Sequence, residues 1–400
     1  MKREKSRALL LLLLCAFSLA AQAPPNTPEI VSRAASLIDA ETGTILYEKN
    51  PDDEIPPASL TKLMTMHIVF REIAAGRASL DETVPLSPES WAGNQPPGSS
   101  LMFLAPGQTV SLREILLGLA VSSGNDAAVA AALRFCPAVR DFAGIMNTEA
   151  RRMGLAKTRF TEPSGISENN ITTAGEFAVF CREYIRQHPE SLSAYHSVPR
   201  FAYPLPSNVA AAYLNSPGTI VQRNRNTLLG NFPGVDGLKT GYIDESGYNI
   251  ALTAEREGTR FIAVLLGAPS GPGGEAARDN DGRKLLSWAF EHFRTIRPSV
   301  KPFPARLWKG KSDWAYLVPA AALPFTAPAG RGDSLGYTAE ITDPLIAPLP
   351  AGHPAGILVI SDGRGELRRV PLVTREAYER GGFFKRTGDG VRMFFRPKAK

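Results

Sequence analysis

Apolar and polar positions along this chain of 400 residues follow two different periods. Segments 35–39 and 44–48 are β-rich and flank a Gly-containing turn, so they predict a hairpin. Between Leu60 and Ala75 the apolar residues recur at the spacing of a helix instead. Pro57, just before this run, is typical of a helix start. The first part of the chain therefore predicts a hairpin followed by an amphipathic helix.

Helical and β patterns continue to about residue 293. A helix is predicted from Ser111, and the pattern from 127 to 187 is mostly helical. Residues 189–232 are rich in Asn and Pro, and we expect them to be irregular. The remaining segments read as strands over 235–242, 249–254 and 260–266 and as an amphipathic helix over 276–293. Together these elements predict a sheet covered by helices.

A second unit is predicted after the Pro-containing stretch 297–304. Beyond it every strong pattern is that of a β-strand, and Pro/Gly turns separate the segments. The predicted strands are 314–318, 337–341, 357–360 and 367–372. We expect a catalytic domain over 24–297 and a small β-sandwich domain over 298–375.

The N-terminus has the pattern of an export signal over residues 1–23. Lys2, Arg3, Lys5 and Arg7 precede an apolar run, which ends in the A-x-A pattern of residues 21–23. The run is too short for a membrane span. We therefore expect export across a membrane.

Charge is unevenly distributed. The formal net charge of the whole chain is +6, and it falls to +3 when residues 1–23 are removed. Residues 380–400 alone carry seven basic residues and Asp389. The basic character thus belongs to the tail and does not indicate nucleic-acid binding. Apolar Phe384, Val391 and Phe395 share one face if 376–400 is helical, which predicts an amphipathic, membrane-associating tail; a disordered basic terminus is the alternative.

Cysteine and histidine usage favours free thiols over a disulfide and argues against a metal site. Cys136 and Cys181 remain after removal of the signal; they could pair, but we expect buried free thiols. The five histidines lack metal-ligand spacing. We expect neither a metal nor a cofactor.

Three short motifs carry the candidate chemistry. Ser59 and Lys62 form S-x-x-K, which returns the amine to the face of the serine one helical turn later. Ser123, Gly124 and Asn125 lie between two predicted helices, where the glycine can relax the backbone. Each motif alone is weak, because a capping serine or a helix connector has the same composition.

The third motif, Lys239-Thr240-Gly241, makes the set specific. The order S-x-x-K, S-G-N, K-T-G resembles the low-molecular-mass penicillin-binding proteins, the serine D-alanyl-D-alanine carboxypeptidases of peptidase family S11. The resemblance extends to the export signal, the β-rich second domain and the tail. It implies the α/β (α+β) fold of the penicillin-binding and serine β-lactamase-like transpeptidases, with an antiparallel sheet covered by helices.

The resemblance also implies a role for each residue. Ser59 is the expected acyl-ester nucleophile and Lys62 its general base, although free lysine has a pKa of about 10.4. Burial and a second cation, which we expect to be Lys239, would lower the pKa of Lys62. Ser123 would relay the proton and Asn125 would orient Lys62. The expected substrate-binding residues are Lys239, Thr240, Gly241 and Tyr242, with the backbone N–H groups of Ser59 and Tyr242 as the oxyanion hole.

These roles imply removal of the terminal D-alanine from peptidoglycan stem peptides that end in D-Ala-D-Ala, and acylation by β-lactam antibiotics. We expect the protein in the periplasm or on the outer face of the cytoplasmic membrane, with 380–400 on the anionic lipid surface. A D,D-endopeptidase that cuts peptide cross-links would use the same residues. A serine β-lactamase is a more remote alternative. Glu162-Pro163-Ser164-Gly165 does not supply the E-x-x-L-N pattern of class A β-lactamases. A non-catalytic wall-binding protein would not need all three motifs.

Overall fold

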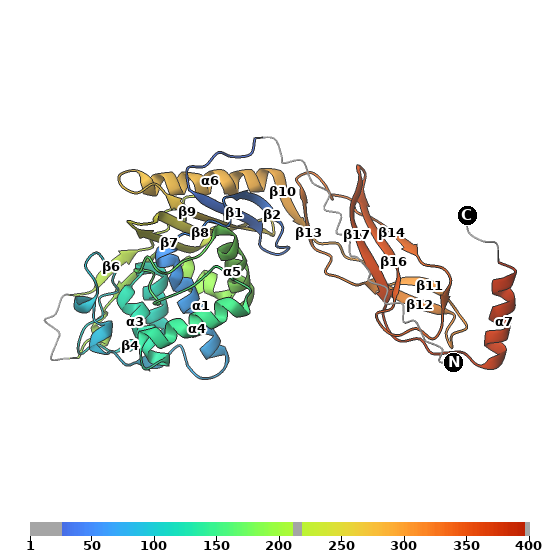
Figure 1. The fold of residues 1–400 in the computed structure, drawn as a ribbon, viewed down its shortest axis with the longest axis horizontal. Helices are drawn as coiled ribbons and strands as arrows, with labels where there is room; N and C mark the ends of the chain where they lie inside the picture. The colour runs from blue at the N-terminus through green and yellow to red at the C-terminus, as the bar shows by residue number, and fades with distance from the viewer. Residues whose placement is uncertain (1–25, 211–217, 397–400) are drawn as a thin grey trace, which may run out of the picture.

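A computed structural model of the chain describes residues 26–210 and 218–396. The expected export signal lies outside the described residues. Figure 1 shows an elongated molecule in which a helix-rich unit and a β-rich unit follow one another, with the last helix at the far end.

A five-stranded antiparallel sheet organises the first unit, in the order β2-β1-β9-β8-β7. Its strands are β1 Ala34–Asp39, β2 Ile45–Lys49, β7 Val235–Ile243, β8 Gly247–Arg256 and β9 Thr259–Ala268. The predicted hairpin of 35–39 with 44–48 and the predicted strands over 235–242, 249–254 and 260–266 are confirmed. Strands from both ends of the unit are neighbours, because β1 pairs with β9 from Ala34↔Leu266 to Asp39↔Phe261.

Helices cover both faces of this sheet (Figure 1). The helices are α1 Lys62–Ala74, α2 Leu112–Leu117, α3 Asn125–Phe135, α4 Val139–Arg152, α5 Ala174–Gln187 and α6 Gly274–His292. Alternate residues of β1 separate the two cores: Ala34 and Ile38 pack with α1 to α5, whereas Ala35 and Leu37 pack with α6. The predicted sheet covered by helices is therefore confirmed.

Residues 189–232 differ from the expectation of irregular structure. They contain an antiparallel pair, β5 Arg200–Tyr203 and β6 Ile220–Arg223. The prediction was wrong because both strands have only four residues and neither alternates between polar and apolar positions, so the surrounding Asn and Pro residues dominated the pattern. The other short pair is β3 Thr83–Val84 with β4 Val110–Ser111.

The second unit is all β up to its last helix. A six-stranded sheet has the order β14-β16-β17-β12-β11-β15, and β10 pairs with β13 in a separate two-stranded sheet. The strands are β10 Phe293–Ile296, β11 Phe303–Trp308, β12 Trp314–Pro319, β13 Phe325–Pro328, β14 Gly336–Ile341, β15 Leu345–Ile346, β16 Pro354–Asp362 and β17 Gly365–Thr374. Side chains from both sheets form one core. The predicted all-β character is confirmed.

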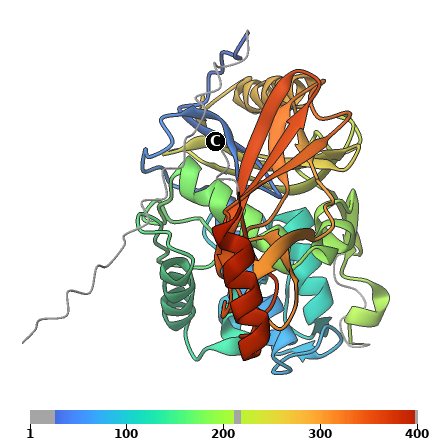
Figure 2. The ribbon, with the colours of Figure 1, turned by 90° about the vertical axis from the view of Figure 1, so that its right-hand side faces the viewer.

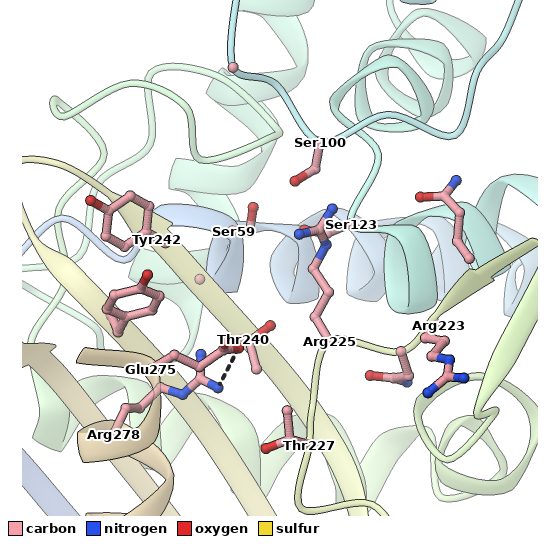
Figure 3. A pocket seen from close by; sticks show the side chains of 15 residues that line it. Ser59, Ser100, Ser123, Arg223, Arg225, Thr227, Thr240, Tyr242, Glu275 and Arg278 are labelled. Carbon is pink, nitrogen blue, oxygen red and sulfur yellow. Dashed lines mark hydrogen bonds and ion pairs between the residues drawn. The ribbon is translucent and has the colours of Figure 1, made fainter. Parts of the chain in front are cut away.

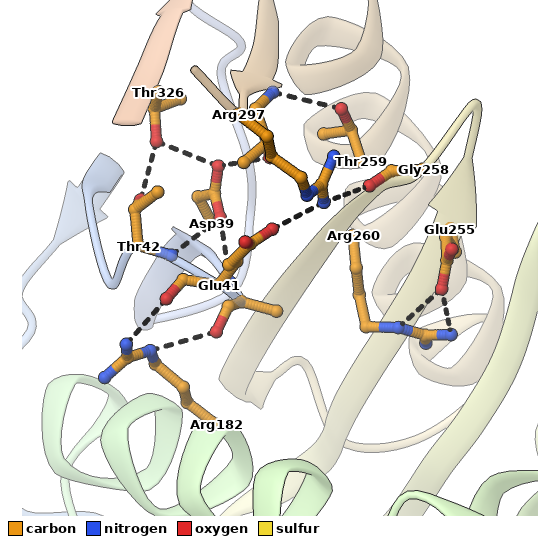
Figure 4. A network of polar contacts seen from close by, with 12 residues as sticks. Asp39, Glu41, Thr42, Arg182, Glu255, Gly258, Thr259, Arg260, Arg297 and Thr326 are labelled. Atoms are coloured by element: carbon orange, nitrogen blue, oxygen red, sulfur yellow. Dashed lines mark hydrogen bonds and ion pairs between the residues drawn. The ribbon is translucent and has the colours of Figure 1, made fainter. Parts of the chain in front are cut away.

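The two units meet at a polar junction (Figure 4). Buried Asp39 accepts hydrogen bonds from Thr295 Oγ1 at 2.7 Å and Thr326 Oγ1 at 2.8 Å. Arg297 pairs with Glu41 on the same side of the junction. Strand β10 pairs with β13 of the second unit. Because β10 ends at Ile296, the β-rich unit begins before the expected boundary at 297/298.

The last helix, α7 Phe383–Phe394, stands at the end of the β unit (Figure 2). It includes Gly388 and Gly390, so these glycines do not prevent helix formation. Residues 383–394 are therefore helical, in contrast to the alternative of a disordered basic terminus. Within the described residues, no helix has both the length and the apolar character needed to cross a bilayer. Cys136 and Cys181 are free and buried, as expected.

Candidate active site

The nucleophile candidate lies on a tight turn that leads into α1. Ser59 belongs to the 3₁₀ turn Ala58–Thr61, and α1 begins only at Lys62. The helix predicted between Leu60 and Ala75 thus opens with a 3₁₀ turn, and its α-helical part begins at Lys62. The preceding Ala58 has a φ of 50°, a left-handed conformation that is uncommon for alanine. This turn holds Ser59, itself partly exposed, in the lining of a cavity.

Lys62 is fully buried and donates only to neutral oxygens. Its Nζ lies 2.9 Å from Ser59 Oγ, 2.7 Å from Asn125 Oδ1 and 2.6 Å from the carbonyl oxygen of Ser164. Burial lowers the pKa of Lys62 from 10.5 to about 7, with Glu162 and Asp126 opposing the shift. A large share of Lys62 is therefore neutral near pH 7 and able to accept a proton from Ser59.

Arg225 further lowers the pKa of Lys62. The charges of Lys62 and Lys239 also interact: burial, then Lys62, then Arg225 and Arg278 hold the pKa of Lys239 well below its ordinary value. Because repulsion between two cations is mutual, this interaction agrees with the expectation that Lys239 disfavours the charged form of Lys62. Lys239 Nζ donates to Ser123 Oγ and to the carbonyl oxygen of Thr240, each at 2.9 Å.

The Ser-Gly-Asn motif follows a π-helical turn, Gly118–Ser122, and leads into α3. Ser123 itself adopts the left-handed conformation, with a φ of 59°, whereas Gly124 has a φ of −61°. The glycine is required for space, because a Cβ there would lie 2.8 Å from the backbone nitrogen of Met102. The expectation that Gly124 relaxes the backbone is thus wrong. Asn125 links Lys62 to Ser99 Oγ, to which its Nδ2 donates at 3.0 Å.

Strand β7 brings the third motif against the nucleophile turn. A Cβ on Gly241 would lie 2.9 Å from both the carbonyl oxygen of Pro57 and the backbone nitrogen of Ser59. Only a glycine lets the strand approach this closely. Thr240 and Tyr242 line the cavity on either side of Gly241, and the ring of Tyr242 packs at a tilt against that of Tyr248, with ring centroids 4.4 Å apart.

The cavity has a volume of about 590 Å³ and a strongly basic lining (Figure 3). It is lined by Ser59, Ser123, Thr240 and Tyr242 together with Arg223, Arg225, Arg278 and Glu275. Arg278 is buried and pairs with Asp279 at 2.7 Å and Glu275 at 3.3 Å. All the predicted site residues therefore lie in or beside one cavity, although they are up to 183 positions apart.

Sequence reasoning missed the arginines and two carboxylates. Buried Asp126 accepts the N–H groups of Met102, Phe103 and Leu104, which fixes the loop beside Ser100. Glu162 accepts from Ser164 N and Gly165 N at 2.6 Å, and this turn presents the Ser164 carbonyl to Lys62.

The only available signals for these groups were local. Asp126 directly follows the Ser-Gly-Asn motif, and Arg223 and Arg225 lie in a stretch without acidic residues. Neither signal specifies contact with the site.

Known proteins resemble the chain over nearly its whole length. It is 34% identical to D-alanyl-D-alanine carboxypeptidase DacC of Escherichia coli over 94% of this chain and 91% of that protein. It is 32% identical to DacA of the same organism, over 93% and 89% respectively. The crystal structure of penicillin binding protein 5 from Haemophilus influenzae superposes with a TM-score of 0.75 at 30% identity, covering 88% of this chain and 99% of that one.

The family profile described as D-alanyl-D-alanine carboxypeptidase matches residues 20–270, which include all three motifs. The two curated relatives also cover the β-rich unit. Motif order, fold and cavity agree with this match. The chain belongs to the D-alanyl-D-alanine carboxypeptidase family, peptidase family S11.

Proposed function

We propose that this chain is a serine D,D-carboxypeptidase that removes the terminal D-alanine from peptidoglycan pentapeptides and thereby limits cross-linking. One observation carries the proposal: the buried amine of Lys62, with a pKa of about 7, lies 2.9 Å from Ser59 Oγ. A serine hydroxyl is a poor nucleophile until a neighbouring base takes its proton. Neutral Lys62 is placed to be that base.

In the first half-reaction, Ser59 Oγ attacks the carbonyl carbon of the penultimate D-alanine while its proton passes to Lys62. The backbone N–H groups of Ser59 and Tyr242 stabilise the oxyanion, and one such donor is typically worth roughly 3–4 kcal/mol in the transition state. The C–N bond then breaks, and the leaving amine takes a proton through Ser123, which lies 2.9 Å from Lys239 Nζ. Water subsequently attacks the Ser59 ester, and the shortened peptide leaves with a free carboxylate.

The basic end of the cavity is suited to a peptide's C-terminal carboxylate. Lys239 and Thr240 offer a charged donor and a hydroxyl, and Arg225 adds a second charge. An anion bound here favours the protonated form of Lys239, whose pKa is otherwise held low by burial. A β-lactam that carries a carboxylate next to its strained amide presents the same two groups, so we infer that β-lactams acylate Ser59.

The surroundings of Glu162 argue against a β-lactamase. Its carboxylate accepts hydrogen bonds from backbone N–H groups of the Ser164 turn and from Asn170 Nδ2 at 2.9 Å. These contacts commit Glu162 to holding the turn rather than to activating a hydrolytic water. The acyl-enzyme formed with a penicillin should therefore be long-lived.

The test of the activity uses purified mature protein and a pentapeptide ending in D-Ala-D-Ala. Mass spectrometry should show loss of one alanine residue, and peptide mapping after labelled penicillin should place the adduct on Ser59. An adduct at another residue, or an intact pentapeptide, would refute the proposal.

We also propose that the exported protein docks on an anionic membrane surface through 380–400. Helix α7 turns its aromatic residues outward: Phe384 is 90% exposed and Phe394 83%. Its opposite face is held by Asp389, which accepts the N–H of Lys309 at 2.8 Å. An apolar face with basic residues around it fits a helix lying in the lipid interface, and each basic residue near anionic lipid contributes roughly 1 kcal/mol.

Vesicle sedimentation tests this membrane proposal. Deleting 380–400 should abolish binding to anionic vesicles without reducing cleavage of soluble peptides, and salt should weaken the binding of the full chain. Equal binding by the two proteins, or no difference between neutral and anionic vesicles, would contradict it.

A further inference from the structure

The β5–β6 hairpin gives one end of the cavity an unbalanced positive charge. Residues 191–235 contain Arg200, Arg223 and Arg225 and no aspartate or glutamate. In the part of the chain that the structure describes, no acidic side chain forms a hydrogen bond or ion pair with any of these arginines. By contrast, Arg278 in the same cavity is paired with Asp279 and Glu275. The guanidinium groups of these three hairpin arginines are therefore available to bind an anion.

Two of these arginines are direct cross-strand neighbours. In the register of β5 and β6, Arg200 lies opposite Arg223, so both side chains leave the same face of the hairpin. Like charges in such positions destabilise a strand pair. A carboxylate bound between them would remove that repulsion and accept hydrogen bonds from guanidinium groups, whose geometry suits planar anions.

The two residues that flank Arg223 form hydrogen bonds within the protein. Gln222 Nε2 donates to the carbonyl oxygen of Leu101 at 2.9 Å. Asn224 Nδ2 donates to the carbonyl oxygens of His196 and Val198, each at 3.1 Å. Hydrogen bonds within the protein thus occupy the side-chain amides on both sides of Arg223. Arg223 and Arg225 line the cavity with no such internal hydrogen bond in the described structure.

The position of Arg223 relates it to the leaving group. Figure 3 shows Tyr242 and Arg223 on opposite sides of Ser59 and Thr240, with Arg225 between Thr240 and Arg223. In the proposed function, the scissile carbonyl binds at Ser59 and Tyr242 and the terminal carboxylate at Lys239 and Thr240. A substrate with this polarity extends its leaving group, not its acyl part, toward Arg223.

We propose that Arg223, with Arg200 beside it, forms a second anion subsite on the leaving-group side, an inference that rests on the proposed function. The subsite takes leaving groups that carry a carboxylate in addition to the one held at Lys239 and Thr240. The amino-acid branch released from a peptide cross-link has this chemistry, so the subsite favours D,D-endopeptidase cleavage beside removal of single D-alanine residues. Arg223 at the end of β6 and Arg225 in the bend that follows both line the cavity, so the two arginines can engage two carboxylates of one leaving group.

The reaction needs no further component. Ser59 Oγ forms the ester as the C–N bond of the cross-link breaks, and the leaving amine takes a proton through Ser123. Water then hydrolyses the ester. Only the size and charge of the leaving amine differ from the carboxypeptidase reaction.

Two substrates with one acyl group isolate the second carboxylate: acyl-D-Ala-D-Glu and acyl-D-Ala-D-Gln. The ratio of their kcat/KM values reports the preference for the extra charge. The wild-type ratio should be about 10, as expected for one added hydrogen-bonded charge. Arg223→Gln should reduce the ratio to about 1, whereas Arg223→Lys should keep part of it, because only the charge remains in place. Arg140→Gln, at an exposed arginine of α4, is the matched control and should keep the full ratio.

Cleavage of acyl-D-Ala-D-Ala separates the possible failures. Normal cleavage of this peptide with a wild-type ratio near 1, or an unchanged ratio in Arg223→Gln, would overturn the subsite and leave the carboxypeptidase proposal intact. No cleavage of any of the three peptides would overturn both. Labelling by penicillin confirms that each variant is folded. A ratio that persists in Arg223→Gln and falls in Arg140→Gln would also count against the subsite.

Discussion

Burial has opposite consequences at the two ends of this molecule. In the cavity, Lys62 is buried among neutral oxygens, and its pKa falls to about 7. At α7, Asp389 is 1% exposed, yet it accepts the N–H of Lys309 and pairs with Lys385. Burial alone would raise the pKa of Asp389, but these partners outweigh it and hold the pKa below its ordinary value.

The pKa shifts of Lys62 and Asp389 differ because of their hydrogen-bond partners, since both side chains are buried. Neutral acceptors do not compensate a buried ammonium for its lost hydration, so Lys62 can become a base. Cationic donors compensate a buried carboxylate, so Asp389 remains charged and holds a helix in place. Burial thus makes Lys62 reactive and lets Asp389 hold α7 in place. Substitutions in the cavity should abolish catalysis, whereas substitution of Asp389 should loosen α7 and leave catalysis unchanged.

The largest expected effect is the loss of acylation in Ser59→Ala and Lys62→Ala. Removing a nucleophile or its base in a serine hydrolase typically lowers kcat by roughly 10⁶-fold. Labelled penicillin and pentapeptide turnover should both fall to background, while thermal unfolding stays cooperative. Stable labelling of Ser59→Ala at the same peptide would contradict the assignment of the nucleophile.

Lys239→Ala should be less severe and should act on binding. Losing a charged hydrogen bond to the terminal carboxylate costs about 1.5–3 kcal/mol, which corresponds to a rise in KM of roughly 10- to 150-fold. Wild-type enzyme should show a similar loss on a substrate with an amidated C-terminus, and the variant should no longer distinguish the two substrates. Lys284→Ala, at an exposed lysine of α6, is the control. An unchanged wild-type rate on the amide would rule out this role.

The pH profile of acylation should follow Lys62. The neutral amine is the active form, and it predominates above its pKa, so kcat/KM should rise with pH and level off above about 7. Below that pH it should fall about tenfold per unit, since protonated Lys62 cannot accept the Ser59 proton. A stopped-flow series with a chromogenic β-lactam measures the profile. A flat profile from about pH 5.5 to 8.5 would show that Lys62 is not the base.

The smallest effect should come from Asp389→Asn, which should loosen α7 by about 1–3 kcal/mol without changing catalysis. Because the pKa of Asp389 is lowered in the folded state, its contribution is present above the unfolded value of about 3.9 and disappears as pH falls below it. Hydrogen exchange of residues 383–394 measures the docking. Asp343→Asn removes only the partly exposed partner of Arg396 and should change exchange much less. Equal exchange in both variants would remove Asp389 from this role.

Much of the fold followed from local patterns. Apolar periodicity located α1 and the β8–β9 hairpin, and Ser111 marked the start of α2, where it forms a capping box with Glu114. These features depend on residues a few positions apart, so a linear pattern contains them. The three motifs in order also identified the chemistry, because each spacing is local.

Tertiary structure decided which charges act on Lys62 and which groups complete the cavity. Arg225 and Glu162 are 163 and 100 positions away from Lys62 in sequence, and no periodicity records their proximity. The β5–β6 hairpin was hidden because its strands are short and its stabilising contacts come from other segments, such as Leu101 and His196. Side-chain distances between remote segments depend on sheet order and on how helices pack across it, and the desolvation that makes Lys62 a base exists only after that packing is complete.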